Sequence, residues 1–231
     1  MVQDNVIAID GPAASGKSTA AKNLAKALGI AYINTGSMFR AIAWKALQNG
    51  ISCRDVAGIE ELLKSTSISY SSEEKGAAPE ICIDGIYPGQ ALRSAEVAQG
   101  ASDVAVIPAV RAFTLELQRD MAKDQLVVME GRDIGTVVFP NAKYKFFLTA
   151  SPKARAYRRL TQGGETPDGS TLESVAAEIA ERDKQDSERP IAPLKQADDA
   201  ILIDSSDNTQ EETLQKLLAL IEQKNTVSVS K

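Results

Sequence analysis

Hydrophobic and polar residues follow two alternating patterns along most of the chain. Short apolar runs, typical of buried strands, occupy residues 6–10, 30–33, 126–129, 144–148 and 200–203. Several segments between these runs place apolar residues three and four positions apart, which is the spacing of one helix face. Strands that alternate with helices in this way predict an α/β fold with a mostly parallel, doubly wound, five-stranded sheet.

Local signals predict where several helices begin and end. The first helix is expected to end at Gly29, because glycine tolerates the left-handed backbone of a helix C-terminus. The second is predicted from about residue 37 to residue 48. The Ser-Pro pair at 151–152 predicts a capped start for a third helix. Asn208 with Glu211 predicts a capped start for the last one.

Two stretches break this alternation. Residues 65–103 carry apolar positions that alternate in twos around glycine and proline turns, which predicts a small antiparallel insertion. Residues 154–190 are rich in Arg, Asp and Glu and contain a glycine-rich linker. The pattern Ser170-x-x-Glu173 in this second stretch predicts a capping box at a helix start. The length of 231 residues fits one α/β domain with insertions.

The residue composition removes several classes of chemistry. The chain has no His, which excludes Ser–His and Cys–His catalytic pairs and zinc sites built on His. With 26 Lys and Arg against 31 Asp and Glu, the net charge is −5, and aromatic residues make up only 5%. An acidic chain with few aromatics argues against nucleic-acid binding, which needs a basic surface or a stacking platform.

The sequence also predicts a cellular location. No run of about 18 apolar residues is present that would span a membrane. The first five residues lack the basic and apolar pattern of a signal peptide. Cys53 and Cys82 lack metal-ligand spacing, and they fit either one disulfide or, as we expect inside a cell, two buried reduced thiols. We therefore expect a cytoplasmic protein.

The strongest chemical signal follows the first predicted strand. Residues 11–18 fit the pattern G-x-x-x-x-G-K-[ST], with a predicted strand before them and a predicted helix after them. The glycines let the backbone wrap around phosphate oxygens, and the helix N-terminus attracts the anion. Lys17 can then reach the β- and γ-phosphates, and the Ser18 hydroxyl is placed to ligate Mg²⁺. No [NT]KxD sequence is present, which argues against a guanine-specific switch protein.

Three other segments place arginine where phosphoryl transfer would use it, since that reaction depends on fixed positive charges around the moving group. Arg40 ends the first segment, and Arg132 follows an apolar strand in the second (residues 130–136). The acidic residue that opens this second segment is typical of sites that position Mg²⁺. The third segment, residues 182–190, places two Arg and one Asp on one helix face. The structural alternatives are a solvated helix cap, an internal Arg–Asp pair and a surface salt-bridge ladder.

Together these pieces resemble the bacterial-type cytidylate kinases. The resemblance rests on IDGPAASGKST, NTGSMFRA, GASDVAVIPAVR, EGRDIGTVVFPNA, ERDKQDSERPIAPL and DAILIDSS, which follow the family order from about residue 6 to residue 206. It implies the P-loop nucleoside monophosphate kinase fold as one kinase domain over residues 1–231, with a monophosphate-binding insertion at 65–103 and an Arg-rich lid at 154–190. It also implies the Mg²⁺-dependent transfer of the γ-phosphoryl of ATP to CMP or dCMP. We expect a monomer that binds neither nucleic acid nor membrane.

The same resemblance implies roles for individual residues. For ATP binding they are Gly11, Pro12, Ala13, Ala14, Ser15, Gly16, Lys17, Ser18 and Thr19. For CMP binding they are Thr35, Arg40, Ser102, Arg111, Arg132, Asp133, Arg182, Asp186 and Arg189. The predicted catalytic charges are Lys17, Arg132, Arg158 and Arg182, and the predicted metal ligand is Ser18.

Cytosine recognition has a physical basis in this set. Arg111 can donate to the N3 and O2 acceptors of cytosine, and Asp133 can accept from its amino group. Uracil presents N3–H and O4 at these positions, so each contact would meet the wrong partner at a cost of about 1–3 kcal/mol. We therefore expect UMP to be a poor substrate.

The chain departs from the family pattern at three positions. Asn34 and Phe39 stand where the family often has Asp and Tyr, and Lys184 stands where Arg is common. These changes remove one carboxylate, one hydroxyl and one bidentate contact, so they bear on rate and affinity more than on identity. Three alternatives stay open: a P-loop kinase for AMP, UMP or shikimate, a regulatory P-loop NTPase that acts through partners, and an inactive nucleotide-binding module.

Overall fold

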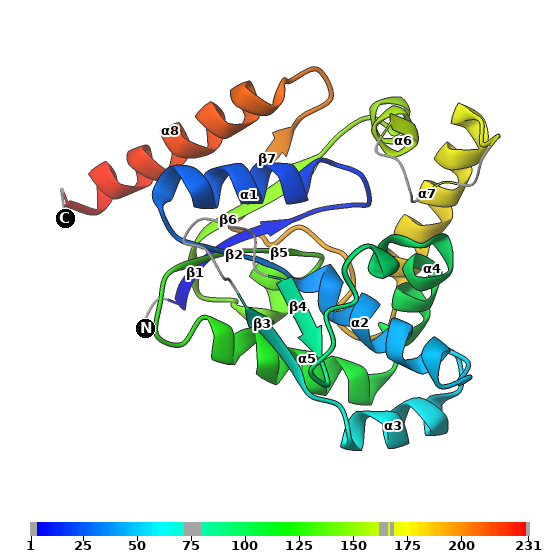
Figure 1. The fold of residues 1–231 in the computed structure, drawn as a ribbon. Helices are drawn as coiled ribbons and strands as arrows, with labels where there is room; N and C mark the ends of the chain where they lie inside the picture. Colours follow the sequence, from blue (N-terminus) through cyan, green and yellow to red (C-terminus); the bar gives the residue numbers. More distant parts are fainter. Residues whose placement is uncertain (1–3, 72–79, 162–165, 167–168, 230–231) are drawn as a thin grey trace.

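A five-stranded parallel sheet forms the centre of the computed structural model, which describes residues 4–71, 80–161, 166 and 169–229. The strand order is β2-β5-β1-β6-β7 (Figure 1). The strands are β1 (Asp4–Asp10), β2 (Ala31–Asn34), β5 (Val127–Gly131), β6 (Ala142–Thr149) and β7 (Ile201–Asp204). The predicted α/β fold and its five parallel strands are therefore confirmed.

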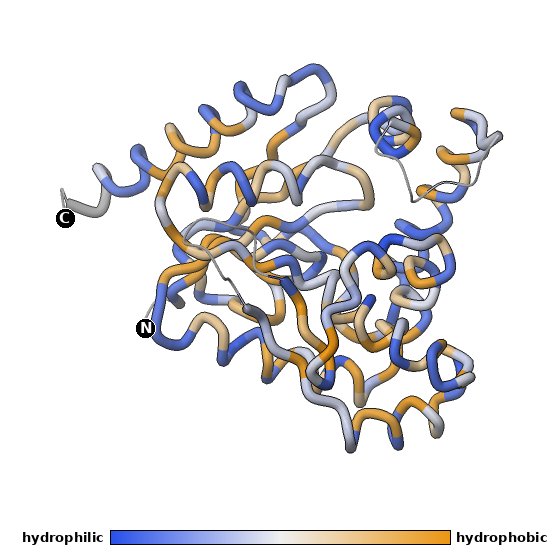
Figure 2. The backbone as a smooth tube through the Cα atoms, in the orientation of Figure 1, coloured by the Kyte–Doolittle hydropathy of each residue, from blue (hydrophilic) through white to orange (hydrophobic). Residues whose placement is uncertain are grey.

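Helices cover both faces of this sheet (Figure 1). α1 (Lys17–Leu28) and α8 (Gln210–Val229) lie on one face, and α2 (Thr35–Gln48) and α5 (Pro108–Met121) lie on the other. Val6 and Ala8 of β1 join the apolar core under α2 and α5. Ile7 and Ile9 join the core under α1 and α8. A strand buried on both faces needs a continuous apolar run, and Figure 2 shows the central strands largely in orange.

The stretch predicted as an insertion contains the two-stranded antiparallel sheet that the alternation indicated. Its strands are β3 (Ile68–Ser71) and β4 (Glu80–Ile83), and residues 72–79 between them lie outside the described residues. The stretch also holds the 3₁₀-helix η1 (Gly89–Arg93) and most of α4 (Ala95–Val104), and α3 (Val56–Lys64) precedes it. The antiparallel prediction is confirmed, but it missed η1 and α4, which both pack against α2.

One predicted helix end and one predicted capped start are confirmed, and another helix starts slightly earlier than predicted. Gly29 ends α1 with a φ of 67°. Ser151 accepts a hydrogen bond from the Ala154 N–H at 3.3 Å at the start of the next helix, α6. The second helix, predicted from about residue 37 to residue 48, is also present and starts two residues earlier, at Thr35. Asn34 caps the helix, since its side chain accepts from the Ser37 N–H at 3.2 Å, and α2 therefore starts directly after it.

The capping box of α7 (Leu172–Glu188) lies one residue beyond the predicted one. Thr171 accepts from the Ser174 N–H at 3.2 Å, and the Ser174 hydroxyl accepts from the Thr171 N–H at 3.0 Å. The predicted pair Ser170 and Glu173 is therefore wrong. A serine paired with threonine satisfies the same two amide groups as the expected Glu would. Most of the glycine-rich linker before it lies outside the described residues.

The cap of α8 is also displaced by one residue. The Thr209 hydroxyl accepts from the Glu212 N–H at 3.2 Å, and the Glu212 carboxylate accepts from the Thr209 N–H at 2.7 Å. The predicted cap of Asn208 with Glu211 is wrong because Asn208 uses its side chain elsewhere. It donates to the Asp204 carbonyl oxygen and accepts from Lys216 in the second turn of α8.

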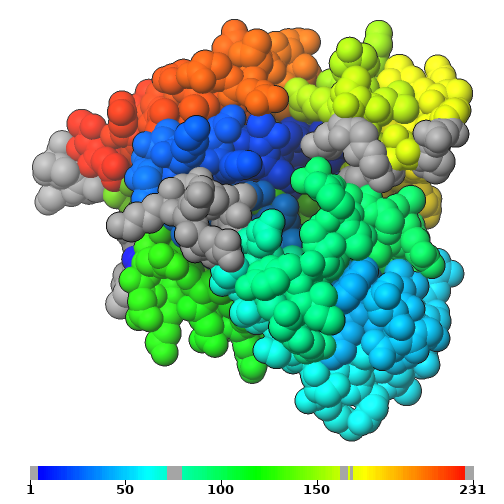
Figure 3. Space-filling view, in the orientation of Figure 1, coloured from blue at the N-terminus to red at the C-terminus, as the bar shows by residue number. Residues whose placement is uncertain are grey.

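α6 (Pro152–Thr161) and α7 pack against each other at the carboxyl end of the sheet. Figure 3 shows this α6–α7 pair in yellow-green above the insertion, which is green and cyan. The pair has its own small apolar cluster, separate from the two main cores, formed by Ala13, Ala156, Val175 and Ile179. The loop that follows β1 therefore contributes one residue, Ala13, to this cluster.

The remaining expectations concern the cysteines and the membrane. Cys53 and Cys82 are both buried and free, which confirms the prediction of two reduced thiols. In the part of the chain that the structure describes, no helix combines the length and the apolar character needed to cross a membrane.

Candidate functional site

The β1–α1 loop (residues 11–16) has a backbone geometry that few residue types allow. Gly11 has a φ of 149°, and a Cβ atom there would lie 2.0 Å from the Leu148 carbonyl oxygen, so the loop can pass this close to β6 only with glycine. Ala14 is held at a φ of 56°, which is uncommon for a residue with a side chain. Gly16, at a φ of 90°, is the N-cap of α1 and supplies no capping side chain. The first amides of α1 are therefore available to an anion.

Lys17, the first residue of α1, turns its side chain back to this loop. Its side chain is buried, and its Nζ donates to the Pro12 carbonyl oxygen at 2.6 Å and to the Ser15 hydroxyl at 3.4 Å. Burial and the nearby Arg132 lower the pKa of Lys17 to about 7, although nearby carboxylates oppose this. The loop therefore holds a buried cation whose charged form a bound phosphate would stabilise.

Asp10, the last residue of β1, connects this loop to the turn that follows β5. Its carboxylate accepts from the Ile134 N–H at 2.8 Å and from the Gly135 N–H at 2.7 Å. Burial raises the pKa of Asp10 to about 6, although these two hydrogen bonds favour the charged form. The turn is a short π-helix, η2 (Ile134–Val138), and it begins directly after Asp133. Asp10 thus holds the segment that carries the second predicted arginine.

A cluster of charged side chains begins directly before this turn. We call it the arginine–aspartate network, and its members are Arg111, Arg132, Asp133, Asp186 and Arg189. The Arg132 Nε donates to Asp186 at 2.8 Å, and the Arg189 Nη2 donates to Asp133 at 3.2 Å. Arg111 also donates to Asp133, and Arg189 lies 3.6 Å from the second oxygen of Asp186. These residues come from α5, from α7 and its C-cap Arg189, and from the segment after β5, and the fold brings them together.

The charges of this network are held by one another. Burial opposes ionisation of Asp186, but Arg132 overcomes it and holds the pKa of that carboxyl below its usual range. At Asp133 burial prevails over Arg111 and Arg189, so the pKa is raised. A buried carboxylate between two guanidinium groups presents acceptor oxygens in a site from which water is largely excluded.

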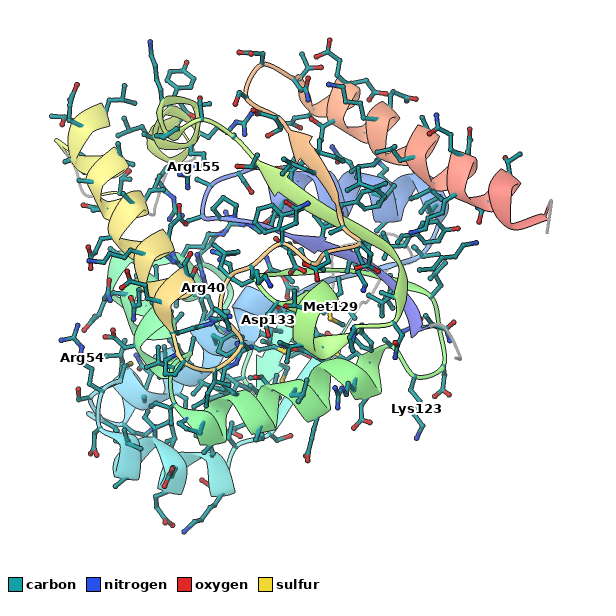
Figure 4. All side chains as sticks on the ribbon, turned by 180° about the vertical axis from the view of Figure 1, so that it is seen from behind. Arg40, Arg54, Lys123, Met129, Asp133 and Arg155 are labelled. Carbon is teal, nitrogen blue, oxygen red and sulfur yellow. The ribbon has the colours of Figure 1, made fainter. Side chains whose placement is uncertain are left out.

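Two other predicted arginines border the network. The Nε of Arg182 is buried and makes no hydrogen bond to any described residue. Burial and the neighbouring Arg132 lower the pKa of Arg182 to about 10, with Arg40 contributing in the same direction. Arg40 donates to the carbonyl oxygen of Leu92 in the insertion at 3.1 Å. Figure 4 shows Arg40, Asp133 and Arg155 along the side of the sheet that faces α7. This concentration of positive charge suits a polyanionic ligand.

The predicted residues Ser102 and Thr35 have structural partners. Ser102 is buried on α4, and its carbonyl oxygen accepts from Gln185 of α7 at 3.3 Å. The Thr35 hydroxyl donates to the Glu130 carbonyl oxygen at 2.8 Å, which attaches α2 to β5. The Glu130 carboxylate accepts from the Tyr32 hydroxyl at 2.9 Å. Both predicted residues therefore lie next to the network and link neighbouring elements.

Arg158 of α6 reaches the β1–α1 loop. Its Nη1 donates to the Ser15 carbonyl oxygen at 3.2 Å and to the Ser205 hydroxyl at 3.0 Å. Its Nη2 donates to the Ser205 carbonyl oxygen at 2.5 Å. Arg158 therefore links the α6–α7 pair, the loop and the end of β7 in one set of hydrogen bonds.

The three departures from the family pattern have distinct surroundings. The Arg111 guanidinium lies over the Phe39 ring, with its Cζ 5.3 Å from the ring centre. This cation–π contact helps to hold the guanidinium in place. Asn34 caps α2, a role that an amide oxygen fills as well as a carboxylate. The side chain of Lys184 is exposed on α7.

Four residues that the fold places here have no site role among the expectations from the sequence. They are Asp10, Tyr32, Arg155 and Asp183. Asp10 had a detectable signal, since it is the polar residue that ends an apolar strand directly before the glycine-rich loop. Tyr32 and Arg155 had none, because their partners lie far away in the sequence.

Comparison with known proteins decides which family has this arrangement. The family model described as cytidylate kinase matches residues 7–223. This chain belongs to the cytidylate kinase family. A cytidylate kinase from Oleidesulfovibrio alaskensis is 46% identical over 210 residues, which cover 90% of this chain and 93% of the relative. One from Desulforamulus reducens is 44% identical over 222 residues, or 96% of this chain and 99% of the relative.

A third cytidylate kinase, from a Geobacillus species, is 44% identical over 218 residues, which cover 94% of this chain and 96% of the relative. Membership in the cytidylate kinase family confirms the resemblance seen in the motifs. The β1–α1 loop and the arginine–aspartate network both lie inside the matched range. Both are therefore part of the unit that the family shares.

Proposed function

We propose that this chain transfers the γ-phosphoryl group of ATP to CMP or dCMP, giving ADP and CDP or dCDP. One observation carries the proposal. A buried lysine, which begins α1 directly after the glycine-rich loop, lies near enough to Arg132 for the two charges to interact, and Arg132 belongs to a network with two buried carboxylates. A donor triphosphate and an acceptor nucleotide would thus meet across Arg132. Phosphoryl transfer depends on such fixed positive charge between the two phosphates.

The donor would bind at the β1–α1 loop and the first turn of α1. The residues we assign to it are Gly11, Pro12, Ala13, Ala14, Ser15, Gly16, Lys17, Ser18 and Thr19. The free amides of α1 and the buried Lys17 support this assignment, because both favour an anion. Arg158 of α6, which donates to the carbonyl oxygen of Ser15, would add a second positive charge beside the loop.

The acceptor would bind at the arginine–aspartate network. Arg40 and Arg132 would hold its phosphate, and Arg182 and Asp186 its sugar. Ser102, Arg111 and Asp133 would contact cytosine, with Thr35 and Arg189 beside them. The Asp133 carboxylate already accepts from two guanidinium groups, so it is oriented before the base arrives. A cytosine amino group can donate to such a carboxylate, whereas the O4 of uracil would face it with a second acceptor.

Magnesium fits the oxygen atoms near the loop. The Ser18 side chain is exposed at the first turn of α1, and the Tyr32 hydroxyl interacts with it while donating to Glu130. Hydroxyl and carboxylate oxygens are the ligands that Mg²⁺ prefers. Ser18 would hold the ion, with Glu130 as its acidic neighbour. When bound, the ion would neutralise charge on the transferring phosphates.

The two insertions would serve the two nucleotides. We assign residues 65–103 to the monophosphate side, since Arg40 contacts Leu92 there. We assign residues 154–190 to a lid, since they carry Arg158 and Arg182. Lid closure would exclude water and limit hydrolysis of ATP. We further propose that residues 1–231 act as one monomeric kinase domain in the cytoplasm, in pyrimidine nucleotide metabolism.

The test is a coupled ADP-release assay with Mg-ATP and a panel of acceptors: CMP, dCMP, UMP, AMP, GMP and shikimate. We expect CMP and dCMP to turn over at about 10–100 per second, which is usual for kinases, and the others to lag by at least about tenfold. Equal rates with UMP or AMP would contradict the base-contacting roles. If no acceptor is phosphorylated while ATP is hydrolysed, the regulatory NTPase becomes the better hypothesis.

A further inference from the structure

Three residues join the α6–α7 pair to the β1–α1 loop. Asp183 of α7 accepts from the Ala13 N–H at 2.9 Å, and its other oxygen pairs with the Arg155 Nη1 of α6. Arg155 completes the triangle by donating to the Ala13 carbonyl oxygen at 3.2 Å. Figure 4 shows Arg155 below α6, on the side that faces the loop. The N–H and the carbonyl of Ala13 are thus both held by one ion pair.

Apolar packing reinforces this joint. The Ala13 side chain is buried in the cluster that it forms with Ala156 of α6 and with Val175 and Ile179 of α7. The ion pair lies beside the cluster and is itself largely shielded, since the side chains of Arg155 and Asp183 are 11% and 16% exposed. A shielded pair that also bonds the backbone restricts orientation more than a surface pair does. The joint therefore fixes both helices to the loop.

The joint lies among the residues that the proposed donor site uses. Arg182 directly precedes Asp183 on α7, and Arg158 follows Arg155 by one helical turn on α6. Arg158 donates to the carbonyl oxygen of Ser15, which lies two residues after Ala13 in the loop. Asp183 also counteracts the fall in the pKa of Lys17. Rotation of either helix would move an arginine away from the loop.

We propose that Asp183, with Arg155, is a positioning residue for the donor nucleotide. The pair holds the loop and the proposed lid in one frame, so that Arg158 and Arg182 face the phosphates when ATP binds. Asp183 acts through these residues and does not contact the phosphates itself. This inference rests on the proposed function, because it takes the β1–α1 loop as the ATP site.

The test compares Asp183→Asn and Asp183→Ala with the wild type. The Asn variant keeps an acceptor for the Ala13 N–H but loses the charge that pairs with Arg155, and the Ala variant loses both. Glu181→Gln is the matched control, because it removes an exposed carboxylate from the same helix. Two quantities are measured: the Kd of a fluorescent ATP analogue, MANT-ATP, and the KM values for ATP and CMP. Thermal unfolding without nucleotide establishes that each variant is folded.

We expect Asp183→Ala to raise the Kd of MANT-ATP and the KM of ATP by about tenfold, as for loss of a hydrogen bond to a charged group. The KM of CMP should change less than about twofold, Asp183→Asn should be intermediate, and Glu181→Gln should match the wild type. In a double-mutant cycle, Arg155→Met should add little to Asp183→Ala, because the two side chains act together.

Three results would overturn the proposal. One is an unchanged affinity for MANT-ATP in both folded variants. Another is an equal rise in the KM of ATP and of CMP, which would indicate a general loss of structure. The third is tighter MANT-ATP binding by Asp183→Ala, which would make Asp183 an internal competitor of the phosphate. A wild type that binds MANT-ATP but phosphorylates no cytidine nucleotide would refute the proposed function alone, because the Kd comparison still tests Asp183.

Discussion

The two halves of the candidate site are built in opposite ways. The β1–α1 loop takes its shape from one continuous segment, whose glycines have backbone angles that place them close to neighbouring elements. The arginine–aspartate network has no such local geometry. Its members come from α5, α7 and the turn after β5, and only packing of those elements brings them within hydrogen-bond distance. A loop can therefore be recognised in a sequence as a motif, but a network has to be assembled by the fold.

The halves also differ in how their charges are balanced. In the network, Asp186 lies between Arg132 and Arg189, and its pKa is held below the usual range. In the loop, Lys17 donates to neutral oxygens and its pKa falls to about 7. The arginines of the network are thus neutralised by its own carboxylates, whereas Lys17 at the loop donates only to neutral oxygens and would be neutralised by a bound anion. This difference leads to four predictions, each made at one charged residue.

The largest effect should come from removing Arg132, the network residue whose charge acts on Lys17. We expect Arg132→Met to lower kcat with CMP by about 100- to 1,000-fold, because a fixed charge at the transferring phosphoryl is lost. Steady-state kinetics with varied ATP and CMP measures this. Loss of Arg132 also leaves Asp186 without its partner at 2.8 Å, so the thermal stability should fall as well.

The control for this experiment is Arg54→Met. Arg54 pairs with Asp103, and the Arg54 side chain is 76% exposed whereas that of Asp103 is 13% exposed. Asp103 also accepts from the Gln99 side chain at 3.1 Å and keeps this partner when Arg54 is lost, so kcat should be nearly unchanged and stability should fall only slightly. A folded Arg132→Met enzyme with the kcat of the wild type would show that the two halves do not meet at this residue.

The next prediction concerns Lys17 and the proton that it should take up when ATP binds. The pKa of about 7 for Lys17 in the unliganded protein lies below its ordinary value of 10.5, so at about pH 8.5 most of this amine is neutral. A bound triphosphate favours the charged form, so ATP binding should take up close to one proton. Calorimetric titrations in two buffers of different ionisation enthalpy measure this uptake, and Lys17→Met should abolish it.

The same shift predicts how stability depends on pH. Between about pH 7 and pH 10.5 the unfolded chain holds a proton on Lys17 that the folded, unliganded protein has released. The free energy of unfolding should therefore rise with pH over this range by more in the wild type than in Lys17→Met. Equal pH slopes for the two proteins would mean that Lys17 is not titrated by folding.

The smallest effect should appear in the choice of base. Asp133→Asn replaces one acceptor oxygen with a donor beside Arg111 and Arg189. We expect the ratio of kcat/KM for CMP over UMP to fall by about tenfold, because the amide can donate to the O4 of uracil. Asp120→Asn, an exposed change on α5, is the charge-matched control and should keep the ratio. An unchanged ratio in a folded Asp133→Asn enzyme would remove Asp133 from base recognition.

The predictions made from sequence succeeded where the physics is local. The apolar run before Gly11 and the apolar spacing after Lys17 predicted the strand, the loop and the helix, because each depends on near neighbours. The exact residue at which a helix starts was harder to predict, since Asn208 and Thr209 are both residue types that favour the N-cap position. The contacts that Asn208 makes with Asp204 and with α8 favoured Thr209.

The sequence by itself therefore determined the parallel sheet, the phosphate-type loop with Lys17, and, through its motifs, the cytidylate kinase family. Only the tertiary structure decided which charges face each other. Asp183 and Ala13 are 170 residues apart in the sequence, and Arg132 and Asp186 are 54 apart. No local preference connects such residues, because their hydrogen bonds form only after the apolar clusters under α1, α2 and α7 have packed the helices around the sheet.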